Sequence, residues 1–260
     1  FETVISNHGG GASPIFHGDK IIVQSDEDGR SFLAALDAGT GRQLWRQQRA
    51  SSKASFATPC HFVGPSGASG LLFNSMASGI TFVNPSTGRT LWEQVDLFDK
   101  RTVSSCLVAE GLLIGTCGSG GGGNYLVALK PGNVAKGSSP SLAYKLRRSI
   151  PYVPTSLAKG GLLFLWSDSG IVTCMRGKSG EIVWQERVEG RFFSSPVWAQ
   201  ERLFCISTTG KVVVLSATEK FRQLAVNNLG EATHSTPALA KGRLFLRTLG
   251  HLICVTGDSK

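Results

Sequence analysis

The sequence predicts an all-β protein, a β-propeller built from six copies of a four-stranded blade. Three repeated landmarks predict it: a tryptophan after a glycine turn, a small-residue pair before an apolar strand, and a short apolar strand preceded by glycine. The 32 glycines follow no collagen-like period and instead separate short apolar runs, as turns do. No helical periodicity of useful length is visible, which argues against a helical fold.

The first landmark is a small-residue turn that ends in glycine and is followed four residues later by tryptophan. Strong copies are Thr40-Gly41 with Trp45, Thr87-Gly88 with Trp92 and Ser179-Gly180 with Trp184, and weaker copies place Tyr144 and Ala225 at the tryptophan position. We expect this strand to be the outermost of each blade, where a large side chain covers the gap between neighbouring blades.

The second landmark is a pair of small residues that precedes an apolar strand. The copies are Ser13-Pro14, Thr58-Pro59, Ser104-Ser105, Thr155-Ser156, Ser195-Pro196 and Thr236-Pro237. Small residues suit a crowded position, so this strand is predicted to be innermost and to line the central channel.

The third landmark is a five-residue apolar strand. The copies cover residues 33–37, 80–84, 126–130, 171–175, 212–216 and 252–256. Together the landmarks indicate four short strands in every 40 to 50 residues, which is a four-stranded meander. One such sheet cannot bury both faces alone, whereas radial stacking of copies buries them and leaves only short edges.

These repeats predict a single domain over residues 1–260. The predicted blades are 9–48, 54–97, 102–148, 152–189, 192–229 and 233–257. The last copy lacks an outer strand, and residues 1–5 lie at the spacing that would supply one and close a six-bladed ring. The alternative is that these are six blades of an eight-bladed parent.

The motif Ala35-Leu36-Asp37, followed by Thr40-Gly41-Arg42 and Trp45, resembles the PQQ-like (pyrroloquinoline-quinone-type) propeller repeat. The resemblance covers nearly the whole chain. The chain is similar to bacterial extracytoplasmic repeat proteins of unknown function and, more distantly, to the outer-membrane assembly lipoprotein propeller. The resemblance implies the fold and an extracytoplasmic location, that is periplasmic, cell-surface or secreted. The resemblance does not predict the function, because one fold hosts unrelated activities.

Quinone-dependent dehydrogenases on this fold hold a divalent cation with carboxylate and amide oxygens, and the alcohol dehydrogenases among them carry adjacent cysteines. This sequence has no adjacent cysteines, and its main acidic cluster, Asp26 to Asp28, is interpreted as a solvated turn. We therefore expect a non-catalytic protein with no cofactor and no bound metal. A quinoprotein oxidoreductase stays as an alternative.

Six cysteines are interpreted as small buried hydrophobic residues within strands. They are Cys60, Cys106, Cys117, Cys174, Cys205 and Cys254. No Cys-x-x-Cys spacing suggests zinc. Cys60 and Cys106 are aligned on neighbouring inner strands, which we expect to lie too far apart for a disulfide.

The segments that enter the innermost strands are the predicted binding site. Their candidate residues are His8, Phe56, Arg101, Tyr152, Arg191, Phe192 and His234. Aromatic and arginine side chains that converge on one mouth of the channel are typical of a surface that recognises a protein or peptide. An alternative is that some of these rings plug the channel.

The net charge of +9 leaves an acidic glycan or another polyanion as an alternative partner. Because the basic residues are scattered, nucleic acid is not expected. No apolar run approaches the ~18 residues of a membrane span. The chain begins at Phe1 without a basic-then-apolar leader, so we expect a processed or trimmed product. The sequence does not indicate an oligomeric state.

Overall fold

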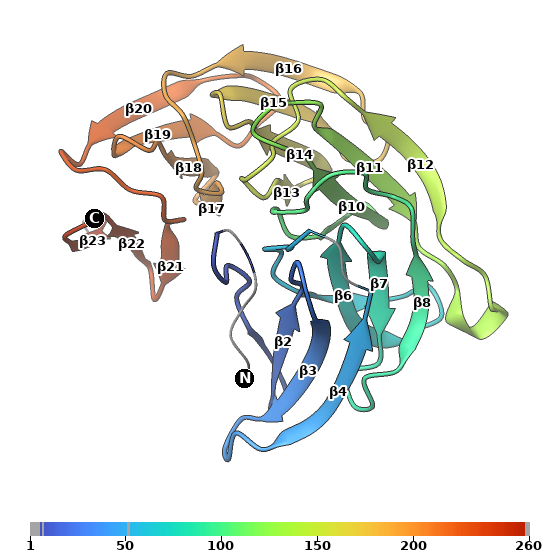
Figure 1. The fold of residues 1–260 in the computed structure, drawn as a ribbon. Coiled ribbons are helices and arrows are strands. Elements are labelled where there is room, and N and C mark those ends of the chain that lie inside the picture. The colour runs from blue at the N-terminus through green and yellow to red at the C-terminus, as the bar shows by residue number, and fades with distance from the viewer. Residues whose placement is uncertain (1–5, 7, 51–52, 258–260) are drawn as a thin grey trace. The chain divides into compact units, whose positions relative to one another are not determined.

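The computed structural model describes residues 6, 8–50 and 53–257. Across this part of the chain the structure is all-β, with one short 3-10 helix, η1 (Val134–Lys136), between strands. The strands form six antiparallel sheets that follow one another along the chain (Figure 1). The chain divides into two compact units, unit 1 (Phe1–Arg148) and unit 2 (Ser149–Lys260), and each contains three of the sheets.

Unit 1 contains the first three sheets. The first sheet consists of β1 (Ile15–His17), β2 (Lys20–Ser25), β3 (Ser31–Asp37) and β4 (Gln43–Arg49). The second consists of β5 (Cys60–Val63), β6 (Ser69–Ser75), β7 (Gly79–Val83) and β8 (Thr90–Gln94). The third consists of β9 (Leu107–Ala109), β10 (Leu112–Cys117), β11 (Tyr125–Lys130) and β12 (Ser141–Leu146).

Unit 2 contains the other three sheets. The fourth sheet consists of β13 (Leu157–Lys159), β14 (Leu162–Trp166), β15 (Ile171–Arg176) and β16 (Ile182–Arg187). The fifth consists of β17 (Val197–Ala199), β18 (Arg202–Ile206), β19 (Lys211–Ser216) and β20 (Gln223–Asn228). The sixth consists of β21 (Ala238–Ala240), β22 (Arg243–Arg247) and β23 (Leu252–Thr256).

Every sheet is a meander in which the strands pair in sequence order. The predicted β-propeller class is confirmed, with five four-stranded blades and a sixth that has three strands among the described residues. The predicted closing strand, residues 1–5, lies outside the described residues. The chain divides into its two units between the third and fourth blades, and the single domain over 1–260 stays a prediction.

The hydrophobic core lies between successive sheets within each unit. Ile22 and Leu33 of the first sheet pack with Phe73 and Val83 of the second. The second and third sheets share a larger cluster, and unit 2 has equivalent clusters between its own sheets. The middle strands are buried on both faces, as in β10, in which all six residues are buried. Short, nearly continuous apolar runs are therefore the expected sequence signal for these strands.

The tryptophan strand lies at the outer edge of its blade, as in β4 and β8 (Figure 1). Trp45 pairs with Ala35 across β3 and β4, and its Nε1 donates a hydrogen bond of 2.9 Å to the carbonyl of Pro85 in the next blade. Trp184 makes the same kind of bond, 3.0 Å long, to the carbonyl of Thr218. Each tryptophan thus joins its own blade to the next one in the chain.

In the other blades, the residue at the tryptophan position pairs with the third strand in the same register. Trp92 is buried opposite Phe82, and Tyr144 lies opposite Ala128. Burial raises the pKa of Tyr144 to about 12. Ala225 occupies the position opposite Val214 in the fifth blade.

The hydroxyl of the small-residue pair joins neighbouring innermost strands. In unit 1, the backbone NH of Ser13 donates to Thr58 Oγ1 at 3.4 Å, and the NH of Thr58 donates to Ser105 Oγ at 2.9 Å. In unit 2, the NH groups of Thr155 and Ser195 donate to the side-chain hydroxyls of Ser195 and Thr236, both at 2.9 Å. A small hydroxyl residue is needed here to accept this bond, as well as to fit a crowded strand.

These bonds correct the alignment of the third blade by one residue. Ser105, not Ser104, is the equivalent of Thr58. Leu107 pairs with Ile114 as Cys60 pairs with Leu72, so Leu107 and not Cys106 is the equivalent of Cys60. Because strand side chains alternate, this shift turns Cys106 to the opposite side from the one expected.

The six cysteines are free thiols, so Cys60 and Cys106 form no disulfide, as expected. Their thiols nevertheless interact with each other across the two innermost strands. The expectation that all six cysteines are buried is wrong. Cys254 is exposed, because β23 is the edge strand of its sheet among the described residues. Cys205 fits the interpretation: it is buried, and burial raises the pKa of its thiol to about 12.

A glycine with positive φ precedes the third strand of several blades. The φ angles of Gly79, Gly170 and Gly210 are 60°, 82° and 84°. A Cβ at any of these positions would overlap a backbone carbonyl, which for Gly210 is that of Glu231. Two constraints therefore require glycine: the left-handed backbone and the close approach of the end of the outer strand or of the chain that follows it.

We predict that Gly210→Ala destabilises the protein more than Gly242→Ala does. Gly242 also has positive φ, 72°, but a Cβ there would have no neighbour within 4 Å. The control should cost about 1–2 kcal/mol for the left-handed backbone alone, and Gly210→Ala should add the cost of displacing the Glu231 carbonyl. Urea unfolding of both variants measures the difference, and equal costs would contradict the close approach.

Candidate functional site

Three of the predicted site residues come together in unit 1 around the ring of Phe56. His8 meets this ring edge-on, with ring centroids 6.3 Å apart, and the guanidinium carbon of Arg101 lies 5.7 Å from the ring centroid. Gly11 passes so close that a Cβ there would lie 2.7 Å from a ring carbon of Phe56. The backbone NH of Phe56 donates to the Thr102 carbonyl at 3.1 Å, which holds this segment against the next blade.

One of the predicted residues of unit 2, Phe192, is not accessible as expected. Phe192 is fully buried and packs against Trp166, with ring centroids 5.3 Å apart, so its side chain is not available to a partner. Its neighbour Phe193 is half-buried and meets the exposed His234 edge-on at 5.3 Å.

Tyr152 and Arg191 lie in the corresponding segments of unit 2. Tyr152 is half-buried, and its backbone NH donates to Asp168 Oδ2 at 2.7 Å. Arg191 is exposed, and its carbonyl accepts from the NH of Thr208 at 2.8 Å. That all the candidate residues of both units share one mouth of a channel stays a prediction.

The alternation of side chains along an extended segment explains why Phe193 was not among the predicted binding residues. Phe56, Phe193 and His234 each lie two residues before the hydroxyl that accepts the inter-blade bond, which is that of Thr58, Ser195 or Thr236. Ser55 and Phe192 lie three residues before it and are buried. In an extended segment, successive side chains point to opposite sides. Counting back from the hydroxyl landmark would have selected Phe193 from the sequence.

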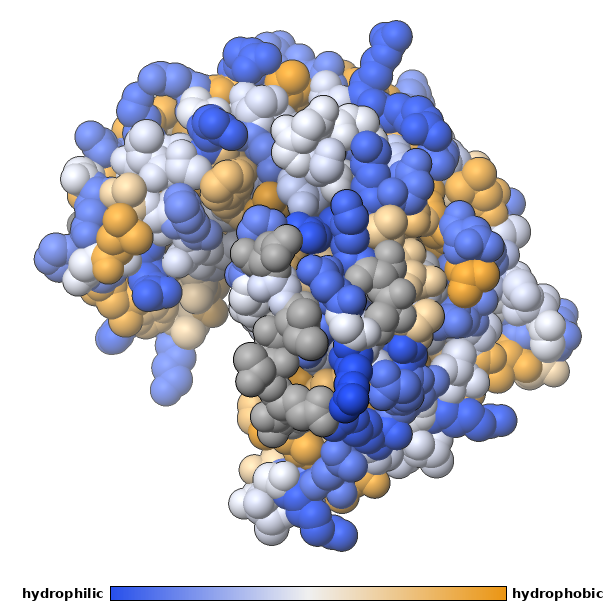
Figure 2. Space-filling model, in the orientation of Figure 1, coloured by the Kyte–Doolittle hydropathy of each residue, from blue (hydrophilic) through white to orange (hydrophobic). Residues whose placement is uncertain are grey.

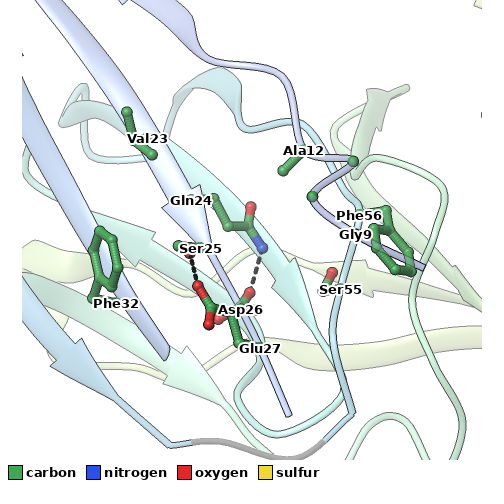
Figure 3. Close-up of a pocket in the computed structure, with 12 residues that line it drawn as sticks. Gly9, Ala12, Val23, Gln24, Ser25, Asp26, Glu27, Phe32, Ser55 and Phe56 are labelled. Carbon is green, nitrogen blue, oxygen red and sulfur yellow. Dashed lines mark hydrogen bonds between the residues drawn. The ribbon is translucent and has the colours of Figure 1, made fainter. Parts of the chain in front are cut away.

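A cavity of about 180 Å³ lies beside Phe56 in unit 1 (Figure 3). It is lined by residues 9–12, 23–27, Phe32, Ser55 and Phe56. The segment that carries Phe56 is held to the end of β2, because the NH of Ser55 donates to the Asp26 carbonyl at 3.1 Å. The cavity therefore lies between the N-terminal glycine segment, β2 and the segment that enters β5.

The acidic cluster at the cavity is not the solvated turn that the sequence suggested. Asp26 and Glu27 are each 6% exposed, and only Asp28 is exposed. Gln24 Nε2 donates to Asp26 Oδ2 at 2.5 Å, and Ser25 Oγ donates to Glu27 Oε1 at 2.6 Å (Figure 3). Both carboxylates are thus held by neighbours on the same strand.

Arg49, at the end of β4, is the partner that makes burial of Asp26 tolerable. Its Nε lies 3.4 Å from Asp26 Oδ1, and both side chains are 4% exposed. Arg49 Nη2 also donates to Ser75 Oγ at 3.1 Å and to Thr81 Oγ1 at 3.2 Å, both in the second blade. Burial raises the pKa of Asp26, against the attraction of Arg49, which favours the charged form.

This arrangement offers several groups that can bind a partner. Among residues 6, 8–50 and 53–257, no three His, Cys, Asp or Glu side chains gather to hold a metal ion. The cavity presents an aromatic wall, backbone groups of a glycine segment and anchored carboxylates. On the face shown in Figure 2, hydrophobic residues occur in small groups separated by hydrophilic ones. A surface of this kind suits recognition by a few anchored side chains.

Comparison with known proteins identifies the family. The family model described as outer membrane protein assembly factor BamB matches residues 2–111 and 128–258. The chain belongs to this family. No curated protein sequence matches the chain. Within the described residues, no helix has the length and hydropathy needed to cross a lipid bilayer.

Two solved structures show how widely the BamB-family fold is shared. BamB from Moraxella catarrhalis is similar with a TM-score of 0.53 and 15% identity, over 99% of this chain and 83% of that one. Quinohemoprotein alcohol dehydrogenase from Comamonas testosteroni is similar with a TM-score of 0.63 and 12% identity, over 100% of this chain and 54% of that one. This chain therefore spans about half the length of the dehydrogenase. At these identities the likeness shows the fold alone.

We predict that Arg49→Met destabilises the protein by about 3–5 kcal/mol, because it leaves the Asp26 carboxylate buried without its cation. Arg42→Met is the matched control: Arg42 is exposed at the turn before β4, and its loss should change stability by less than about 0.5 kcal/mol. The double variant Asp26→Asn/Arg49→Met should recover part of the loss. Urea unfolding checks all three, and a double variant no more stable than Arg49→Met would contradict the pairing.

Proposed function

We propose that this protein is a non-catalytic scaffold that binds a protein or peptide through the Phe56 surface, defined as Phe56, His8 and Arg101 with the adjoining cavity. The observation that carries the proposal is the convergence of these three side chains beside a cavity. They come from segments far apart in the sequence and from different blades.

The composition of the Phe56 surface supports a protein partner. Aromatic and arginine residues dominate the binding energy of protein interfaces, where an aromatic anchor beside a pocket contributes most. Phe56 is held in place by Gly11 and by its backbone bond to Thr102, so little conformational entropy is lost when a partner contacts it. Phe193 and His234 repeat the same edge-on aromatic pairing in unit 2.

Family membership supports the same class of function. The name of the matching family describes a factor in the assembly of outer membrane proteins, whose partners are proteins. By this relation we propose an extracytoplasmic location for the protein. The Comamonas testosteroni dehydrogenase supports a shared fold and adds no argument for oxidoreductase chemistry in this chain.

A polyanion, such as an acidic glycan, is the second candidate, because the net charge is +9. The buried carboxylates that line the cavity argue against an anion at the Phe56 surface. An anion would instead bind to scattered exposed lysines and arginines. The two candidates therefore differ in where they bind and in how strongly salt weakens the binding.

We predict that Phe56→Ala weakens binding to the peptides selected from a peptide array at least about tenfold, which corresponds to about 1.4 kcal/mol. Phe16→Ala is the control, because the Phe16 side chain is 68% exposed on β1 and lies outside the Phe56 surface. Affinities are measured by fluorescence anisotropy on the peptides that the unmodified protein selects.

The polyanion candidate predicts a different result in the same assay with heparin as the probe. Heparin affinity should fall steeply with added salt and should be the same for both variants. If peptides bind Phe56→Ala as tightly as the unmodified protein, or if none binds at all, the Phe56 surface is not the recognition site.

A further inference from the structure

A pair of histidines joins the innermost strands of the first two blades. His17 is the last residue of β1, and His61 is the second residue of β5. Their Nδ1 atoms lie 3.2 Å apart, while the ring centroids are 5.2 Å apart. These distances mean that the two nitrogens face each other across the gap between the rings. Neither histidine belongs to the Phe56 surface.

The hydrogen bond of the other His61 nitrogen decides its tautomer. His61 Nε2 lies 3.0 Å from the Phe16 carbonyl oxygen. A carbonyl oxygen can only accept, so Nε2 carries the proton and donates it. In the neutral ring, Nδ1 then presents a lone pair toward His17. A ring NH donated to a backbone carbonyl is also the support that orients histidines that bind metals.

The separation of the two Nδ1 atoms suits one bound ion. Nitrogens bound to a tetrahedral ion at about 2.0–2.1 Å lie roughly 3.3 Å apart, close to the 3.2 Å between His17 and His61. Both histidines sit on strands rather than loops, and the bond from the Ser13 NH to Thr58 Oγ1 ties the segments that lead into these strands. The pair is therefore preorganised by the packing of the two blades.

The charges around the pair permit a cation. Lys20 and Asp19 lie near His17, and their side chains form an ion pair of 2.5 Å, so their charges largely cancel. His61 is exposed and reachable from solvent.

We propose that His17 and His61 bind one divalent transition-metal ion, of the Zn²⁺, Ni²⁺ or Cu²⁺ class, through their Nδ1 atoms. Imidazole nitrogen suits these three ions. No third His, Cys, Asp or Glu ligand joins the pair within the described residues, so water fills the remaining positions. The site is thus an open, exchangeable one that bridges two blades, and a ligand from a binding partner can complete it.

The test is isothermal titration of the full chain with Ni²⁺ and with Zn²⁺ alone. We expect one ion per chain, and a loss of affinity of at least about tenfold in His17→Ala and in His61→Ala, because each removes one of two ligands. His251→Ala is the matched control: His251 is exposed in unit 2 and bonds to Glu231 at 2.8 Å. The His251→Ala variant should bind Ni²⁺ and Zn²⁺ as tightly as the unmodified protein does.

A second readout separates ligation from a structural effect. Cu²⁺ bound at one equivalent should show coupling to two imidazole nitrogens in its electron paramagnetic resonance spectrum, and His17→Gln should reduce this to one. The circular dichroism spectra of the variants should match that of the unmodified protein. Unchanged affinity in both alanine variants, or no binding at one equivalent, overturns the proposal and leaves the pair as a hydrogen bond between two neutral rings.

Discussion

The structure depends on one constraint, which is that a four-stranded meander of apolar strands has two faces to bury and cannot bury either alone. Each sheet of a unit meets this constraint by packing against the next, as Ile22 and Leu33 do against Phe73 and Val83. Burial of this apolar area is the main favourable term in folding. The other contacts between blades, such as the bonds from Trp45 and Trp184 to carbonyls of the next blade, set how one sheet sits on another.

The same constraint determines where binding groups can lie. Middle strands are filled by core side chains, so the segments that enter the innermost strands are left to carry polar and aromatic groups. Their hydroxyl residues hold neighbouring blades together, and alternation then gives each segment one buried and one accessible side. Phe56 lies on the accessible side and Ser55 on the buried side, where its hydroxyl bonds to the Asn74 carbonyl. Structure and binding thus use alternate residues of one segment.

The polar groups in unit 1 show how a repeat acquires individual sites. The Asp26–Arg49 ion pair and the His17–His61 pair are not part of the repeat landmarks. Arg49, His17 and His61 lie on strands, and Asp26 directly follows β2. A BamB assembly factor and a quinohemoprotein dehydrogenase share this fold at 15% and 12% identity. The blades therefore supply a frame, and the residues that depart from the repeat decide what each frame binds.

The sequence by itself determined the strands, their order in each blade and the position of the tryptophans, because alternation, glycine turns and a repeat of 40 to 50 residues are local signals. It also indicated Phe56, His8 and Arg101 as neighbours, because the repeat places them in equivalent segments. Only the tertiary structure decided that Phe193 and not Phe192 is accessible, and that Asp26 is buried beside Arg49. Only the tertiary structure brought together His17 and His61, which are 44 residues apart. Each of these depends on a side chain's direction or on a contact between blades, and a repeat pattern records neither.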